Sequence, residues 1–241
     1  YSVNIMPKFD KNLKSKNKKW SFEGNVHKYF DDHVTKSVPF YLEVHQIINS
    51  FSDYFLSSNS IVYDIGCSTG TLLHSLNKRH LDKEKIKFIG MDISRDMINH
   101  AKNKYKHKRI SFINKNATKY KFKKCSLILS IYTVQFIQPK IRQELINKIY
   151  ESLDWGGAFI LFEKVRGSDA RFQDMMSSVY NEYKTNQGFN PEEILNKTDS
   201  LKGVLEPFSR EGNLGLLKRS GFKDIETIFR YNCFEGYLAI K

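Results

Sequence analysis

Residues 61–70 constrain the fold of this chain more than any other stretch. They read Ile-Val-Tyr-Asp-Ile-Gly-Cys-Ser-Thr-Gly. A short β-branched apolar run is typical of a buried parallel strand. Gly66 and Gly70 let the backbone turn sharply and approach a ligand before a helix that we expect to begin near Thr71. The stretch therefore predicts a strand, a glycine loop and a helix in succession.

A second predicted strand, 86–91, ends at Asp92, about 20 residues after Gly70. An acidic side chain at such a strand end can accept hydrogen bonds from both hydroxyls of a ribose. The loop lacks the third glycine of the dinucleotide fingerprint, and no Gly-Lys-Ser/Thr follows, so it is not a phosphate-binding P-loop. The pattern indicates a nucleoside-binding βαβ unit.

Strands and helices continue to alternate, which predicts an α/β fold with a doubly wound, mostly parallel sheet and right-handed crossovers. Trp155-Gly156-Gly157 predicts a helix stop and turn. The expected strands are 60–65, 86–91, 109–113, 126–131, 158–163, 222–229 and 232–240. The expected core helices are 71–79, 95–106, 140–153 and 212–220.

We expect two helical additions to this core within a single domain, 20–241. A cap, 20–57, carries helices over 26–30 and 41–55, with Pro39 in the first turn of the second. An insertion, 167–207, carries helices over 170–186 and 191–202, the latter capped by Asn190. The core then comprises 58–166 and 208–241, and residues 1–19 form a flexible basic lead-in.

Composition narrows the class of protein. The 241 residues, 40% of them hydrophobic, fit one α/β domain with a proper core. No apolar run approaches the roughly 18 residues of a membrane span, so we expect no membrane association. Cys67, Cys125 and Cys233 show neither disulfide nor zinc spacing, which favours a reducing cytoplasm and predicts no metal.

The net charge of +13 leaves two interpretations open. A basic protein can bind nucleic acid. The lysines are spread through the chain, however, with a local cluster only between Lys8 and Lys19. A solvated surface or a basic patch that faces a substrate is therefore favoured over a nucleic-acid partner. A homodimer is left open.

The glycine loop followed by Asp92 resembles motif I of the class I S-adenosylmethionine-dependent methyltransferases. This resemblance implies a Rossmann-like seven-stranded sheet with an N-terminal helical cap and a helical insertion before the last two strands. Beyond motif I, residues 20–241 resemble the carboxy-S-adenosylmethionine synthases, which convert S-adenosylmethionine and prephenate to the carboxylated cofactor used in wobble-uridine modification of tRNA. The segments that carry this resemblance are Trp20-Ser-Phe22, Ser37-Val-Pro-Phe-Tyr41, Tyr63-Asp-Ile-Gly-Cys-Ser68, Met91-Asp-Ile-Ser94, Thr133-Val-Gln-Phe136, Gly156-Gly-Ala158, Glu163-Lys164 and Gly221-Phe222.

The resemblance implies a set of cofactor-binding residues. Tyr41 would touch the cofactor from the cap, and Asp92 with Ile93 would hold the ribose. Asn116 stands where the family has Asp, but its amide oxygen can still accept from the adenine amine. Ile131 stands where the family has Asn. The full set is Tyr41, Asp64, Gly66, Cys67, Ser68, Gly70, Asp92, Ile93, Met97, Asn116, Ala117, Ser130 and Ile131.

One departure from the family affects the expected reaction. The family holds the extra carboxylate of its cofactor with an Arg in the helix before the final Gly-Phe, and counting back from Gly221-Phe222 gives Leu216. Leu cannot replace a bidentate Arg–carboxylate pair. We therefore expect ordinary S-adenosylmethionine as cofactor, S-adenosylhomocysteine as product and a small molecule as methyl acceptor. Carboxylated-cofactor synthesis, RNA or tRNA modification, and a non-enzymatic scaffold are the alternatives.

Methyl transfer to an amine or hydroxyl needs a base close to the acceptor. The candidates are Tyr132, Glu163, His27 and Tyr180, with His33 and Tyr183 as further possibilities. Tyr132 is favoured because the end of the fourth strand faces the sulfonium in this superfamily. Each candidate also has a structural interpretation: surface or capping for the histidines, helix packing for Tyr180 and Tyr183, and pairing with Lys164 or Arg166 for Glu163.

Overall fold

The structure is a computed structural model that describes residues 20–22 and 24–241. The predicted lead-in, 1–19, lies outside the described residues. The described chain forms a seven-stranded sheet with the order β3-β2-β1-β4-β5-β7-β6. The strands are β1 (Ile61–Ile65), β2 (Lys87–Asp92), β3 (Ile110–Asn114), β4 (Cys125–Ile131), β5 (Leu153–Lys164), β6 (Asp224–Tyr231) and β7 (Phe234–Ile240).

Strands β1 to β5 are mutually parallel, and β7 is antiparallel to both β5 and β6. Strand β1 lies between β2 and β4, so the chain order reverses there. Ligands of open α/β sheets bind at such a switch point, outside the carboxyl ends of the strands. The topology therefore predicts a ligand site at the carboxyl ends of β1 and β4.

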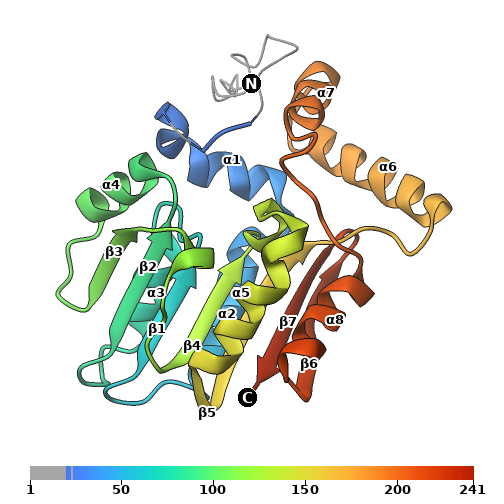
Figure 1. The fold of residues 1–241 in the computed structure, drawn as a ribbon. Helices are drawn as coiled ribbons and strands as arrows, with labels where there is room; N and C mark the ends of the chain where they lie inside the picture. Colours follow the sequence, from blue (N-terminus) through green and yellow to red (C-terminus); the bar gives the residue numbers. More distant parts are fainter. Residues whose placement is uncertain (1–19, 23) are drawn as a thin grey trace.

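Helices cover both faces of the sheet, as expected for a doubly wound fold (Figure 1). Helices α2 (Tyr41–Ser52), α3 (Thr71–Arg79) and α4 (Arg95–Lys104) pack on one face. Helices α5 (Pro139–Ser152) and α8 (Arg210–Ser220) pack on the other. The predicted seven-stranded Rossmann-like fold is confirmed.

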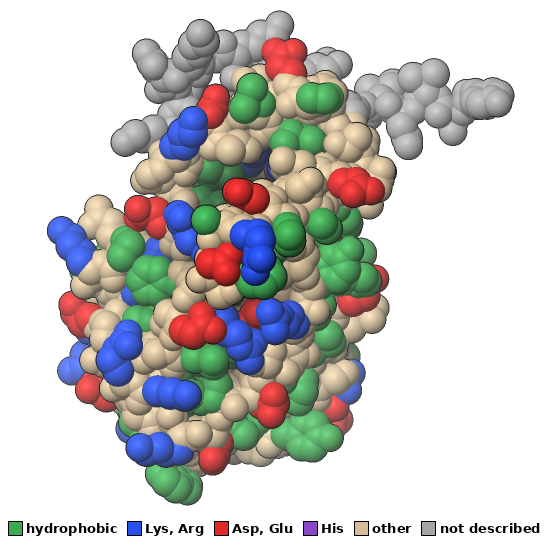
Figure 2. Space-filling view, turned by 90° about the vertical axis from the view of Figure 1, so that its right-hand side faces the viewer, with side chains coloured by type: hydrophobic (Ala, Val, Ile, Leu, Met, Phe, Trp, Pro, Cys, Tyr) green, Lys and Arg blue, Asp and Glu red, His purple; other side chains and the backbone are tan. Residues whose placement is uncertain are grey.

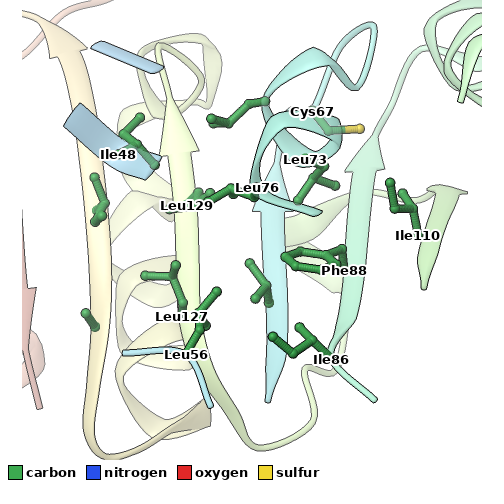
Figure 3. Packing of buried hydrophobic residues seen from close by; sticks show 14 of the residues in the cluster. Ile48, Leu56, Cys67, Leu73, Leu76, Ile86, Phe88, Ile110, Leu127 and Leu129 are labelled. Carbon is green, nitrogen blue, oxygen red and sulfur yellow. The ribbon is translucent and has the colours of Figure 1, made fainter. Parts of the chain in front are cut away.

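Each face of the sheet has its own hydrophobic core. On the α2–α4 face, Ile48, Leu73 and Leu76 from helices meet side chains of the strands, among them Phe88 and Leu129 (Figure 3). These side chains are at most 2% exposed, as are most of their neighbours. Burial on this scale, at about 25 cal/mol per Å² of apolar surface, makes the sheet a rigid base for the loops at its edge.

The first part of the cap and the insertion lie above the carboxyl ends of the parallel strands, whereas α2, the last helix of the expected cap, packs on a face of the sheet (Figure 1). The cap contains a 3₁₀ helix, η2 (Gly24–Lys28), and α1 (Phe30–Ser37) before α2. The insertion contains α6 (Ala170–Asn186) and α7 (Pro191–Ser200). The Trp20 backbone N–H donates to the Ser200 carbonyl at 2.9 Å, and the Tyr180 hydroxyl donates to the Ser37 carbonyl at 2.8 Å. These bonds join the two additions to each other.

The connections that lead to the site are short. A 3₁₀ turn, η3 (Ala117–Lys119), follows β3, and another, η4 (Val134–Phe136), follows β4. As predicted, Asn190 caps α7: its side chain accepts from the Glu193 backbone N–H, while the Glu193 carboxylate accepts from the Asn190 N–H. This reciprocal capping box fixes where α7 begins.

Three local predictions were wrong. The first cap helix is 3₁₀ over Gly24–Lys28, and its α-helical part begins only at Phe30. Pro39 precedes α2, whose N-cap is Phe40. Trp155-Gly156-Gly157 belongs to β5, where the Gly156 N–H donates to the Lys241 carbonyl at 2.8 Å. A positive φ of 78° at Gly156 lets the strand bulge there, so pairing with the chain end replaces the expected turn.

Candidate active site

A cavity of about 1110 Å³ opens at the carboxyl ends of β1, β2 and β4. Its walls come from the glycine loop after β1, the cap, the η4 turn and the insertion. Ligand pockets commonly measure about 300–1,000 Å³. The cavity is therefore large enough for a nucleoside cofactor and a second small molecule.

The glycine loop lies at the centre of the cavity wall. Gly66 has φ 76°, and a Cβ there would lie 2.1 Å from Oγ1 of Thr133. The N–H groups of Gly66 and Cys67 both donate to the Met91 carbonyl, at 2.8 and 3.1 Å. Ser68 takes φ 48°, which is uncommon for a residue with a side chain. The loop thus crosses the strand ends in a tight path that admits no side chain at Gly66.

Asp92 lies at the end of β2 and lines the cavity. Its Oδ2 accepts from the Ser68 N–H at 3.1 Å, and its Oδ1 accepts from the Ser94 N–H at 2.8 Å. Burial raises the pKa of Asp92, and these backbone donors offset part of the rise. Each carboxylate oxygen keeps a lone pair for a further donor, so Asp92 can accept from ribose hydroxyls.

Asp64 provides a test of whether the site fits a cationic cofactor. Its carboxylate is buried, lines the cavity, and has no hydrogen bond or ion pair with any described residue. Burial, with the nearby charge of Asp92, raises its pKa to about 7. A buried acid without a partner is costly unless a cation joins it. The ammonium and sulfonium of S-adenosylmethionine fit this requirement.

The adenine end differs in detail from the expectation. Asn116 and Ala117 line the cavity, as do Tyr41, Cys67, Ile93 and Ile131. The Asn116 amide oxygen already accepts from the backbone N–H and the hydroxyl of Thr118, at 2.9 and 2.8 Å. Because this oxygen caps η3, the amide NH₂ rather than the oxygen is left to face adenine.

Three of the predicted cofactor residues lie behind the cavity wall. Gly70 is the N-cap of α3, with φ 80°. Met97 is buried in α4, and Ser130 is buried in β4 with no partner for its hydroxyl. None of the three lines the cavity. They support the wall rather than meet the ligand.

Tyr132 and Tyr180 line the cavity, but both are protonated at neutral pH. Burial raises the pKa of each hydroxyl. Tyr132 has φ 56°, and its buried hydroxyl has no hydrogen-bond partner. The hydroxyl of Tyr180 is occupied by the Ser37 carbonyl. Neither hydroxyl is therefore suited to act as a base.

The structure does not place Glu163 or His27 on the cavity wall. Glu163 is buried, and its Oε1 accepts from the Val134 N–H at 2.9 Å. Burial raises its pKa to about 8, and its role is to hold the η4 turn. His27 lies on η2 with its ring 5.2 Å from that of His100. Neither candidate base therefore lines the cavity.

His33 lies in the wall, whereas Tyr183 does not. Burial, with the charges of Lys197 and Lys36, lowers the pKa of His33 to about 3. The ring is therefore neutral at physiological pH, and its Nε2 lies 3.2 Å from the Ser37 hydroxyl. His33 is too weak a base to take a proton efficiently.

A basic patch that faces a substrate was one of the expectations from the net charge, but the sequence did not locate it within the cavity. Lys164 and Glu163 were considered as a pair, but neighbouring residues of a strand point to opposite faces. Lys164 therefore lines the cavity while Glu163 does not. Arg166, Lys184 and Lys197 line it as well. The sequence did contain a signal for Lys184: it follows Tyr180 by four residues, so the two side chains lie on one face of α6.

Leu216 does not lie where a cofactor-binding residue would be needed. Leu216 is 2% exposed in α8 and packs in the core beside α5, away from the cavity. An arginine there would be buried in that core and would not reach a cofactor. The absence of a charge at this position therefore says nothing about the carboxylated cofactor.

The described part of the chain contains neither a candidate metal site nor a candidate membrane span. Between residues 20 and 241, residue 23 apart, no group of three His, Cys, Asp or Glu side chains is arranged to hold a metal ion. Over the same residues, no helix is long and apolar enough to cross a membrane.

Comparison with known proteins identifies the family. Residues 62–157 match the family model for a methyltransferase domain. The carboxy-S-adenosyl-L-methionine synthase of Staphylococcus epidermidis is 39% identical over 223 residues, which cover 92% of this chain and 97% of the relative. The same enzyme from Campylobacter lari is 37% identical over 93% of this chain and 95% of the relative. This chain belongs to the carboxy-S-adenosyl-L-methionine synthase family.

Solved structures agree on the fold of this synthase-family chain. Human N-acetylserotonin methyltransferase in complex with S-adenosylmethionine aligns with a TM-score of 0.61 at 14% identity, covering 99% of this chain and 60% of that one. A methyltransferase from Methanosarcina mazei aligns with a TM-score of 0.57 at 16% identity, covering 79% and 96%. The chain is an S-adenosylmethionine-dependent enzyme with the class I methyltransferase fold.

Proposed function

We propose that the enzyme attaches a carboxyl group to the methyl carbon of S-adenosylmethionine. One observation carries this proposal: two carboxylates of the cavity lie beside the glycine loop, and three basic side chains gather where β5 meets the insertion. Asp64 and Asp92 lie beside the glycine loop, whereas Lys164, Arg166 and Lys184 line the part formed by β5 and the insertion. An anion is thereby favoured beside the bound cation.

The names of the relatives support this reaction over the methyl transfer that we first expected. The objection from Leu216 no longer stands, because that residue faces the core. The family resemblance implies prephenate, a dicarboxylate, as the second substrate. Its charge matches the basic wall.

The reaction needs a donor of the carboxyl group and an acceptor for the proton that leaves the methyl carbon. Prephenate carries a carboxylate and a hydroxyl on opposite carbons of its ring, so losing both leaves an aromatic product. The carboxyl carbon bonds to the methyl carbon, and the hydroxyl leaves with the displaced methyl proton as water. The chain's own residues bind and orient the two reactants, which is the larger part of such catalysis.

The chain's side chains have defined tasks in this proposal. Asp64 and Asp92 hold the cationic and ribose parts of the cofactor. Tyr132 donates a hydrogen bond beside the reacting carbon, since its hydroxyl has no other partner. The cap and insertion exclude water, because they join above the strand ends.

A second candidate is methyl transfer to an anionic small molecule. The match to a methyltransferase domain over residues 62–157 supports it, and the same basic wall would bind such an acceptor. The products of the two reactions differ: one is a carboxylated cofactor, the other S-adenosylhomocysteine.

The test is incubation of the purified enzyme with S-adenosylmethionine, with and without prephenate, followed by mass spectrometry. We expect a prephenate-dependent product with the mass of the cofactor plus one carbon dioxide. S-adenosylhomocysteine from an acceptor mixture, without that product, would support methyl transfer instead. The cytoplasmic location stays a prediction.

A further inference from the structure

Two lysine ammonium groups lie over the ring of Tyr180. The Nζ of Lys164 is 4.4 Å from the ring centroid, and the Nζ of Lys184 is 4.6 Å from it. Lys164 ends β5, while Tyr180 and Lys184 are one turn apart on α6. All three side chains line the cavity. The arrangement thus brings two positive charges to one aromatic ring from two separate elements.

Other contacts hold this arrangement in place. The Tyr180 hydroxyl donates to the Ser37 carbonyl, and its ring lies 5.3 Å from that of Phe234, edge to face. The Lys164 backbone N–H donates to the Gln135 side-chain oxygen at 2.9 Å. The ring and the lysine backbone are therefore fixed before any ligand arrives.

The two ammonium groups lack a carboxylate partner. Among the ion pairs of residues 20–22 and 24–241, none includes Lys164 or Lys184. Glu163, the neighbouring acid, instead accepts from the Val134 N–H. The attraction of each ammonium group to the ring offsets only part of the repulsion between the two positive charges.

Both lysines have pKa values below the ordinary value for lysine. Burial lowers the pKa of Lys164. Burial and the charge of Lys164 lower the pKa of Lys184 to about 8. An anion between the two groups would raise both pKa values and so favour the charged form of each lysine, and it would gain charge-assisted hydrogen bonds from each.

We propose that Lys164 and Lys184 together bind a carboxylate of the second substrate at the ring of Tyr180. The identity of that substrate rests on the proposed function, but the carboxylate subsite does not. A carboxylate could reach this place from two sources, the second substrate or the carboxylated cofactor. We assign the subsite to a carboxylate of the second substrate.

The test uses malonate as a charged probe and malonamide as its neutral analogue. Each is titrated calorimetrically into the full chain saturated with S-adenosylhomocysteine. The variants are Lys164→Gln and Lys184→Gln, with Lys218→Gln, an exposed lysine of α8, as the matched control for charge. We expect malonate to bind tighter than malonamide, and each cavity variant to lose about tenfold in malonate affinity.

The control variant should match the wild type, and Lys184→Arg should recover most of the affinity. Unchanged affinity for S-adenosylhomocysteine shows that the variants remain folded. Equal binding of malonate and malonamide, or malonate affinity that is the same in all variants, would overturn the proposal.

Titration with the carboxylated cofactor separates the two sources. If the lysine variants lose only the preference for the carboxylated over the ordinary cofactor, the subsite binds the product and the assignment to the second substrate is wrong. If prephenate yields no carboxylated product while malonate binding still depends on both lysines, the proposed function fails and the subsite stands.

Discussion

Gly66 shows how one residue controls the cavity. Its positive φ is only part of the constraint, because Gly156 has nearly the same φ, 78° against 76°. The difference is space: a Cβ at Gly156 meets nothing within 4 Å, whereas one at Gly66 would lie 2.1 Å from Thr133 Oγ1. Substitutions at these two glycines therefore distinguish the effect of backbone strain from the effect of a steric clash.

We predict that Gly156→Ala costs only the strain of a left-handed residue, about 1–2 kcal/mol of unfolding free energy. Gly66→Ala should lose about 2 kcal/mol more and should bind S-adenosylmethionine at least tenfold more weakly, because the loop must move. Urea denaturation and calorimetric titration measure the two effects. Equal losses of stability in both variants, with cofactor affinity kept, would show that the loop relaxes freely.

Asp64 couples cofactor binding to pH. Its pKa rises from the ordinary 3.8 to about 7 in the folded chain. Between these values the native state binds more protons at this site than the unfolded state does. The contribution of Asp64 therefore makes the ligand-free protein less stable as pH rises across that window.

We predict that affinity for S-adenosylmethionine increases as pH rises through about 7, since only the ionised carboxylate attracts the cation. Asp64→Asn should bind weakly at every pH, with a flatter profile, and should raise the melting temperature of the ligand-free protein near pH 8. Calorimetry between about pH 5.5 and 7.5 measures the profile. A wild-type affinity that is constant over this range would refute the coupling.

At the scale of elements, α1 is fastened to the glycine loop by one side chain. Asp31 accepts from the Thr69 hydroxyl at 2.5 Å and from the Thr71 hydroxyl at 3.3 Å. Lys104 of α4 pairs with the same carboxylate at 2.9 Å. Among the described residues, the adjacent Asp32 pairs with Lys36 alone, one turn along α1. Asp31 therefore links the cap to the loop, and Asp32 does not.

We predict that Asp31→Ala loosens α1, with faster amide hydrogen exchange over residues 33–37. Cofactor affinity should fall about fivefold, a loss of about 1 kcal/mol. Asp32→Ala is the matched control and should leave both measurements within error of the wild type. If the two variants behave alike, α1 is held by its apolar contacts rather than by Asp31.

At the scale of the whole molecule, the net charge is unevenly placed. Residues 1–19 hold six lysines and one aspartate, a net +5 of the total +13. On the face that carries α8 and β6, basic and acidic side chains are mixed (Figure 2). The two cavity carboxylates, Asp64 and Asp92, and the cavity bases Lys164 and Lys184 belong to the described part of the chain, outside this basic segment.

We predict that removing residues 1–19 leaves S-adenosylmethionine affinity unchanged and lowers any retention on tRNA. Phosphate contacts give binding a steep salt dependence, so elution is measured against salt concentration for both forms of the chain. A steep slope that survives the truncation would locate a nucleic-acid surface on residues 20–241 and favour a tRNA partner.

Much of the fold could be predicted because it follows from local patterns. The apolar run at Ile61–Ile65, the glycine loop and Asp92 specify a nucleoside-binding unit through backbone freedom and strand spacing alone. The prediction that Asn190 caps α7 likewise depended only on residues close in the sequence. Where a distant partner intervenes, as at Gly156 beside Lys241, the local signal predicted a turn that pairing turned into a strand.

The sequence by itself determined the α/β fold, the family resemblance and the cofactor loop, because these depend on residue types at short spacings. Only the tertiary structure decided which side chains meet. It turned Glu163 inward and Lys164 into the cavity, buried Leu216 in the core, and set Lys184 of a separate helix beside Lys164. The physical reason is that the direction of a side chain and the approach of distant elements are fixed by packing across the whole molecule.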